Sequence, residues 1–208
     1  MTRIVQEQSR AVVAGSGIVL RGDDIDTDRI IPARFAKAPT FAALGEGVFY
    51  DDRAAAARQG SVHPFDDPDR APATIMLVNK NFGCGSSREH AVAALMRWQN
   101  GIQAIAGESF AEIFFNNCMA NGIPAVTVSA SGIEVLMHAS EAEPETRFRL
   151  DLHSMTITGD DLTIAVAMLP GARTRLIDGS WDTLAGLLAQ RPRIRALAAS
   201  LPYLGGFP

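Results

Sequence analysis

Residues 81–90, NFGCGSSREH, combine side chains and spacings that suit acid–base chemistry on a bound anion. The segment follows the apolar run 74–78 and opens a helical pattern. A strand that passes through a glycine-containing turn into a helix leaves unpaired N–H groups and the positive end of the helix dipole, a binding place for carboxylate or phosphate. The hydroxyls of Ser86 and Ser87 and the guanidinium of Arg88 lie at this point. The sequence therefore predicts a site that holds a carboxylate or phosphate and acts on a molecule bound beside it.

The same residues have a structural alternative, because Ser86 and Glu89 have the spacing of a capping box. Arg88 weighs against it: a guanidinium in the first helical turn opposes the dipole at up to about 1 kcal/mol. A carboxylate ligand would turn this cost into a bidentate contact. Gly83 and Gly85 permit close backbone approach to a ligand. The segment lacks both the lysine of an NTPase phosphate loop and the third glycine of a dinucleotide site.

Cys84 lies beside the predicted helix start, a place where a thiol pKa can be lowered. The nearby candidate for a base is His90, about one turn into the helix. We favour a thiol without nucleophilic chemistry and keep the reactive thiol as the alternative.

The acidic run 23–28 contains three alternating aspartates, as at the start of an EF-hand loop. Arg29 occupies the glycine position of such a loop and Phe35 the glutamate position, which argues against calcium. We favour a solvated acidic turn. The alternative is that Thr27 and Asp28 orient or neutralise the arginine of a substrate site.

Composition narrows the class of protein. The 208 residues carry a formal charge of −4 with an isoelectric point near 5.5, which argues against a dedicated nucleic-acid binder. No apolar run reaches the length of a membrane span, and residues 1–17 lack the apolar core of a signal peptide, so we expect a cytoplasmic protein. We expect Cys84 and Cys118 to be free thiols. The two cysteines and four histidines lack ligand spacing, which argues against a self-contained zinc or iron–sulfur site.

The elements around the motif alternate between strand and helix. The apolar pattern predicts strands at 17–21, 74–78, 102–106 and 124–128, and helices at 87–98, 109–120 and 131–139. Such alternation predicts a parallel sheet with right-handed crossovers. Ser109 and Glu112 have capping-box spacing, so we expect the second helix to begin at Ser109.

The flanking regions are less regular. Residues 1–14 are expected to be frayed or an edge strand, and 33–72 to be a long functional loop with a possible helix near 52–59. Beyond residue 147 we predict strands at 148–152, 155–158 and 163–168, a helix at about 180–190 and a second short helix.

Three motifs together resemble the small subunit of 3-isopropylmalate dehydratase, which is similar to the mobile last domain of aconitase. They are residues 23–33, 81–91 and 107–118, and the resemblance runs from about residue 16 to 180. It implies an α/β fold: a swivelling β/β/α domain with a central, mostly parallel sheet and flanking helices. The chain would form one such domain, 1–208, with a substrate loop at 33–72 and a C-terminal β/α appendage at 147–208.

The resemblance also implies roles for the site residues. Ser86 matches the base that removes the proton α to a carboxylate. Ser87 and Arg88 match residues that hold a substrate carboxylate, and Thr27 and Asp28 match the site-edge motif. No cofactor or metal is expected on this chain, because the family's 4Fe-4S cluster lies in a separate large subunit, the expected partner.

A further implied element is the loop that selects the substrate's side group, here Phe35, Ala36 and Lys37. Ala36 is smaller than the apolar residue common at this position in the family. Lys37 either contacts a third carboxylate, as in a homoaconitase-like enzyme, or points to solvent, and we favour solvent.

The implied activity is the interconversion of 2-isopropylmalate and 3-isopropylmalate by dehydration and rehydration, in leucine biosynthesis. One alternative is the same mechanism on homocitrate, dimethylmalate or citraconate. Another is a non-catalytic anion-binding module. RNA binding, known among aconitase relatives, is disfavoured by the acidic charge.

The purified chain alone is expected to show no turnover of hydroxy acids. A serine removes a proton from carbon only if its alkoxide is stabilised in a closed, dry site, and an isolated chain leaves Ser86 in water. The measurement is turnover of 2-isopropylmalate by the chain with and without its large subunit. Turnover without the partner would contradict the expectation.

Overall fold

The computed structural model describes residues 9–35, 41–86, 88–201 and 203. Its strands are β1 (Val12–Leu20), β2 (Ile75–Val78), β3 (Ala104–Gly107), β4 (Ala125–Thr127), β5 (Arg147–Asp151), β6 (Thr156–Gly159) and β7 (Leu162–Ala165). Its α-helices are α2 (Thr27–Ile30), α3 (Tyr50–Arg58), α4 (Glu89–Leu95), α5 (Glu112–Ala120), α6 (Ala130–Ala142), α7 (Pro170–Asp178), α8 (Thr183–Ala189) and α9 (Arg191–Ser200). Three 3-10 helices, η2 (Phe41–Gly47), η3 (Pro64–Asp66) and η4 (Pro68–Arg70), lie between α2 and β2.

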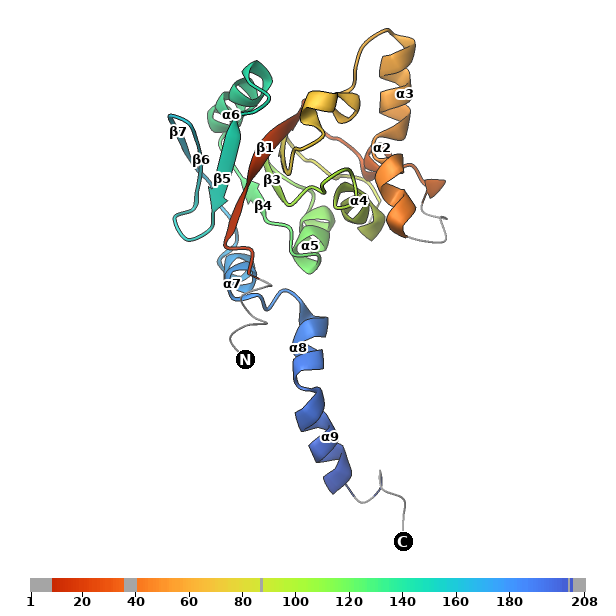
Figure 1. Ribbon diagram of the computed structural model, residues 1–208, viewed down its shortest axis with the longest axis vertical. Helices are drawn as coiled ribbons and strands as arrows, with labels where there is room; N and C mark the ends of the chain where they lie inside the picture. The colour runs from red at the N-terminus through yellow and green to blue at the C-terminus, as the bar shows by residue number, and fades with distance from the viewer. Residues whose placement is uncertain (1–8, 36–40, 87, 202, 204–208) are drawn as a thin grey trace.

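Within the described residues the strands form one sheet in the order β4-β3-β2-β1-β5-β6-β7 (Figure 1). The neighbours from β4 to β1 pair in parallel, and those from β1 to β7 pair antiparallel. The α/β class with flanking helices is confirmed. The sheet is mixed rather than mostly parallel, because the strands from residue 147 onward continue it from the other edge of β1. These strands are part of the central sheet.

Two hydrophobic clusters cover the two faces of the sheet. Side chains alternate along β1, so Ile18 and Leu20 join the cluster beneath α4 and α5, whereas Val19 joins the cluster beneath α6 and α7. Figure 1 shows α4 and α5 on one side of the sheet and α6 on the other. Strands β2 and β3 are buried along their whole length, as expected of parallel strands covered on both faces.

Two element boundaries differ from the sequence expectation. β1 begins at Val12, so the first strand is longer than predicted, and it occupies the middle of the sheet. α5 begins at Glu112 behind an N-cap, Ala111, that makes no side-chain cap. The predicted start at Ser109 is wrong because the Ser109 hydroxyl accepts a hydrogen bond from the Asn81 N–H instead (2.9 Å).

Two further predictions, for the region of α7 and for the 33–72 segment, differ from the structure. Helix α7 was not predicted. Its first-turn proline is a common helix start, but no polar residue caps it. The 33–72 segment, apart from 36–40, contains the helix expected near 52–59, which is α3, but the rest is less irregular than expected. Its Phe49 and Phe65 rings pack together (centroids 4.8 Å apart), and Phe65 packs on Trp98 (4.6 Å). The segment thus contributes to the core on the α4 side.

The C-terminal helices α8 and α9 extend away from the sheet (Figure 1). Their large apolar side chains are exposed: Leu184, Leu187, Leu188, Ile194 and Leu197. Among the described helices none is long and apolar enough to cross a membrane.

Replacing Phe114 with Ala is expected to destabilise the fold by about 3–5 kcal/mol, the usual cost of deleting a buried ring. Phe114 is 1% exposed and packs edge-on against Phe82, with ring centroids 5.2 Å apart. Urea unfolding of the isolated chain measures the loss. The neighbouring Ile113, 49% exposed, is the control, and Ile113→Ala should change the free energy of unfolding by under about 0.5 kcal/mol. Equal effects of the two changes would contradict the packing described.

Candidate functional site

The candidate site lies where β1 and β2 end. The two strands are parallel neighbours with Leu20 opposite Val78, so the segments that follow them leave the sheet side by side. In open α/β sheets, ligands bind beyond the carboxyl ends of the strands. The acidic segment 23–28 and the segment 81–86 are therefore neighbours at the edge where chemistry is expected.

Backbone hydrogen bonds join these two segments. The Gly83 N–H donates to the Ile25 carbonyl (2.8 Å), and the Thr27 N–H donates to the Cys84 carbonyl (2.8 Å). The Thr27 hydroxyl donates to the Ser86 carbonyl (2.9 Å) and is buried. Thr27 therefore fixes the backbone of Ser86 by a hydrogen bond within the chain.

Two glycines make this approach possible. Gly85 has φ +89°, and a Cβ there would lie 2.0 Å from Asp26 Oδ2. Gly83 has φ +78°, and its Cβ would lie 2.2 Å from Cγ of Phe114. Both positions need a left-handed backbone and leave no room for a side chain. The Asp26 carboxylate fills the space over Gly85 and accepts a hydrogen bond from the Asp28 N–H (2.6 Å), which caps α2.

Arg88 and Asp28 form a bidentate ion pair. Nη1 of Arg88 lies 2.5 Å from Oδ1 of Asp28, and Nη2 donates to Oδ2 at 3.1 Å. The arginine side chain is 24% exposed and the aspartate side chain 50%. Asp28 is thus an ion-pair partner of Arg88 and not only a solvated carboxylate. The role of this pair in substrate binding stays a prediction.

The start of α4 differs from the predicted one. The helix begins at Glu89, with Arg88 as an extended N-cap residue that makes no side-chain cap. The capping-box interpretation of Ser86 is wrong, because Ser86 lies outside the helix and its exposed hydroxyl makes no hydrogen bond in the described part of the chain. α4 spans seven residues, shorter than the predicted 87–98. Ser87 lies outside the described residues.

The cysteines are free, as expected, and unsuited to nucleophilic chemistry. Burial and the carboxylates of Asp26 and Asp24 raise the pKa of the Cys84 thiol. Complete burial raises the pKa of Cys118 well above its usual range. The raised pKa argues against the alternative of a reactive Cys84 thiolate. Among the described residues, no three His, Cys, Asp or Glu side chains gather as metal ligands do.

Only part of the predicted specificity loop is described, since Ala36 and Lys37 lie outside the described residues. The Phe35 ring packs on Tyr50 with centroids 5.1 Å apart. The Arg34 guanidinium lies over both rings and forms an ion pair with Asp51. Contacts among exposed cations, acids and rings are worth little singly, but together they order the base of the loop.

The sequence reasoning missed a set of side-chain bonds between the two segments. The Lys80 N–H donates to Asp23 Oδ1 (3.1 Å), and Nδ2 of Asn81 donates to Asp24 Oδ1 (2.8 Å). These aspartates therefore connect loops and do not form a calcium site. A single sequence offers no signal for such pairs, because the partners are far apart in the chain.

Cys84 is expected to react with iodoacetamide more slowly than a small free thiol at pH 7, because the thiolate is the reactive form and its pKa is raised. Raising the pH should increase the rate. Buried Cys118 should react only after unfolding. Mass spectrometry of the labelled chain gives both rates. Faster labelling of Cys84 than of free cysteine at pH 7 would contradict the raised pKa.

Comparison with known proteins agrees with this geometry. Residues 12–131 match the family described as the aconitase C-terminal domain. The 3-isopropylmalate dehydratase small subunit of Synechocystis sp. is 50% identical over 192 residues, which cover 92% of this chain and 94% of that protein. The small subunit of the same name from Thermus thermophilus is 43% identical over 192 residues, with the same coverage. A solved 3-isopropylmalate dehydratase from Methanocaldococcus jannaschii shares the fold, with a TM-score of 0.64 and 24% identity over 89% of this chain and 98% of that one. The chain therefore belongs to the aconitase C-terminal domain family and, within it, to the small subunits of 3-isopropylmalate dehydratase.

Proposed function

We propose that this chain is the small subunit of a heteromeric hydro-lyase that interconverts 2-isopropylmalate and 3-isopropylmalate by dehydration and rehydration, in leucine biosynthesis. The observation that carries the proposal is the Ser86 hydroxyl. It is exposed and without a hydrogen bond in the described chain, in a loop held by Thr27 and close in sequence to the Arg88–Asp28 ion pair. A hydroxyl that serves neither as cap nor as core contact is available for a ligand.

Ser86 is the proposed base. Dehydration of a 2-hydroxy dicarboxylate begins with loss of a proton from the carbon next to a carboxylate, and the resulting charge spreads onto the carboxylate oxygens. Arg88 and, as the family implies, Ser87 would hold that carboxylate and stabilise the charge. Rehydration returns the proton from the Ser86 hydroxyl to carbon.

The ion pair leaves Arg88 able to bind a second carboxylate. Asp28 takes one hydrogen from each terminal nitrogen of the guanidinium. The Nε–H makes no hydrogen bond within the described residues, and arginine has five N–H donors in all. Asp28 would therefore fix the plane of the guanidinium while its Nε edge receives the substrate.

The large subunit is the proposed partner and the proposed carrier of the 4Fe-4S cluster, with no cofactor on this chain. When bound there, the cluster supplies a Lewis acid for the hydroxyl that leaves. The substrate loop at Phe35, Ala36 and Lys37 is proposed to face the substrate's side group. A cytoplasmic location remains part of this proposal.

The substrate is tested first with the complex of this chain and its large subunit, on 2-isopropylmalate, homocitrate, dimethylmalate and citraconate in parallel. We expect turnover of 2-isopropylmalate to exceed the others in kcat/KM. Preference for homocitrate would instead favour contact between Lys37 and a third carboxylate. Absence of turnover on every acid would refute the hydro-lyase proposal.

Ser86→Ala is expected to lower kcat of the complex by about 100-fold or more, the usual contribution of a positioned base. The KM should change little, because Arg88 still holds the carboxylate. Steady-state kinetics measure both constants, and co-purification with the large subunit shows that assembly is intact. Ser154→Ala, at an exposed serine in the turn between β5 and β6, is the matched control with unchanged kcat. Near-normal turnover by Ser86→Ala would remove the base from the proposal.

A further inference from the structure

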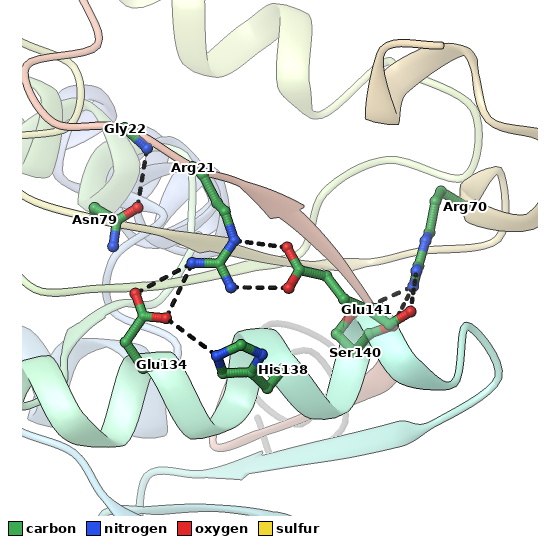
Figure 2. A network of polar contacts seen from close by, with 8 residues as sticks. All are labelled: Arg21, Gly22, Arg70, Asn79, Glu134, His138, Ser140 and Glu141. Carbon is green, nitrogen blue, oxygen red and sulfur yellow. Dashed lines mark hydrogen bonds and ion pairs between the residues drawn. The ribbon is translucent and has the colours of Figure 1, made fainter. Parts of the chain in front are cut away.

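We propose that Asn79 is a positioning residue for the proposed reaction, because its side-chain amide fixes the two site segments relative to each other. This inference rests on the proposed function. Asn79 directly follows β2 and is 9% exposed. Its Oδ1 accepts a hydrogen bond from the Gly22 N–H (3.0 Å), as Figure 2 shows, and its Nδ2 donates to Glu108 Oε1 (3.2 Å).

The amide thus connects the segments that follow three neighbouring strands. Gly22 leads into the acidic segment after β1, Asn79 begins the segment after β2, and Glu108 follows β3. The order β3-β2-β1 places Asn79 in the middle. The Asn79 amide accepts a hydrogen bond on one side and donates one on the other. One planar group therefore contacts the segments on both sides of its own.

The aspartate carboxylate bonds between these segments are more exposed than the Asn79 bonds. The Asp23 and Asp24 carboxylates bond Lys80 and Asn81 at exposed positions, where water competes for the same groups. The Asn79 bonds are the less accessible ones, and a buried amide that loses a partner is left with an unsatisfied polar group. Backbone hydrogen bonds also join the two segments, from the Asp24 N–H to the Lys80 carbonyl (3.0 Å) and at Ile25 and Thr27. Asn79 adds a buried side-chain contact directly after β2, and this contact also reaches the β3 segment.

The acidic segment is held from the opposite side by Arg21. Nε and Nη2 of Arg21 donate to the Glu141 carboxylate (2.7 and 2.8 Å), and Nη1 donates to Glu134 (3.0 Å), both on α6 (Figure 2). The guanidinium lowers the pKa of Glu141. Arg21 thus ties the residue before Gly22 to α6, and the Asn79 amide ties Gly22 to the end of β2.

The position of Asp28 and Ser86 follows from this spacing. The acidic segment carries Asp28, which holds Arg88, and the β2 segment carries Ser86, whose backbone Thr27 holds. A shift of one segment against the other would move the proposed base relative to the arginine without removing either. Misplacement of reacting groups by about 1 Å costs up to about 100-fold in rate.

The test is Asn79→Asp in the complex with the large subunit. The change keeps the size and the acceptor for Gly22 but sets a carboxylate against Glu108. We expect kcat to fall at least tenfold, with assembly retained. Because two facing carboxylates share a proton more readily as the pH falls, the ratio of variant to wild-type kcat should rise from pH 8 to pH 6. A merely stabilising role would not produce this pH profile below the unfolding temperature.

The double variant Asn79→Asp/Glu108→Gln exchanges the amide and the carboxylate, and it should recover most of the lost kcat. If Asn79→Asp alone does not fold, Glu108→Ala and Glu108→Gln test the same contact. A lower kcat in Glu108→Ala and a near-normal kcat in Glu108→Gln support the inference, because only glutamine keeps an acceptor for the Asn79 amide.

The outcomes separate the two proposals. Wild-type kcat in Asn79→Asp at every pH, or equal kcat in the two Glu108 variants, overturns the positioning role and leaves the proposed function intact. Lack of turnover by the wild-type complex on every acid overturns the proposed function, and the positioning role with it.

Discussion

Parallel pairing of β1 with β2 is the constraint on which the candidate site depends. The two strands run in the same direction, and Leu20 lies opposite Val78 near their ends. Each strand is followed by a segment that leads to a short helix, α2 or α4. Since neither segment has regular structure to set its course, the bonds between them do so. The pair Thr27–Cys84 extends the parallel association beyond the sheet, and Ser86 follows directly from it.

Packing on two sides explains the glycines of this segment. Phe114 approaches from α5 and fills the space at Gly83, while Asp26 approaches from the neighbouring segment and fills the space at Gly85. The alternating small residues are thus required by the chain itself, without a ligand. The glycines allow a close backbone approach, and here the approaching groups are a core ring and a capping carboxylate. What remains for a ligand is the exposed end of the segment, at Ser86 and Arg88.

The sequence was informative where local periodicity decides the structure. Apolar runs predicted β2 and β3, and short β-like runs predicted β6 and β7. Local patterns failed where a distant partner competes. The Ser109 hydroxyl has cap spacing but bonds Asn81, and the Asp23 and Asp24 carboxylates suggest a metal loop but bond the β2 segment. Such competition depends on which strands become neighbours, which a single sequence does not state. The motif resemblance predicted Ser86 and Arg88 as site residues, and it gave no signal for the Asn79 amide.

Exposure of the Arg88–Asp28 pair indicates why the site would need a second surface. A pair that is 24% and 50% exposed is worth about 0–1 kcal/mol in water, so it orients the guanidinium but binds a third charge weakly. Covering the pair with another protein would lower the local dielectric and strengthen each contact to a substrate carboxylate. The same covering would bury one positive group, the Arg88 guanidinium, together with the carboxylates of Asp28 and the substrate, so the buried charge would be net negative. Burying a net negative charge is costly unless the covering protein supplies positive charge. The proposed metal centre on the partner would supply it, and Ser86 would then meet its substrate in the dry environment that an alkoxide needs.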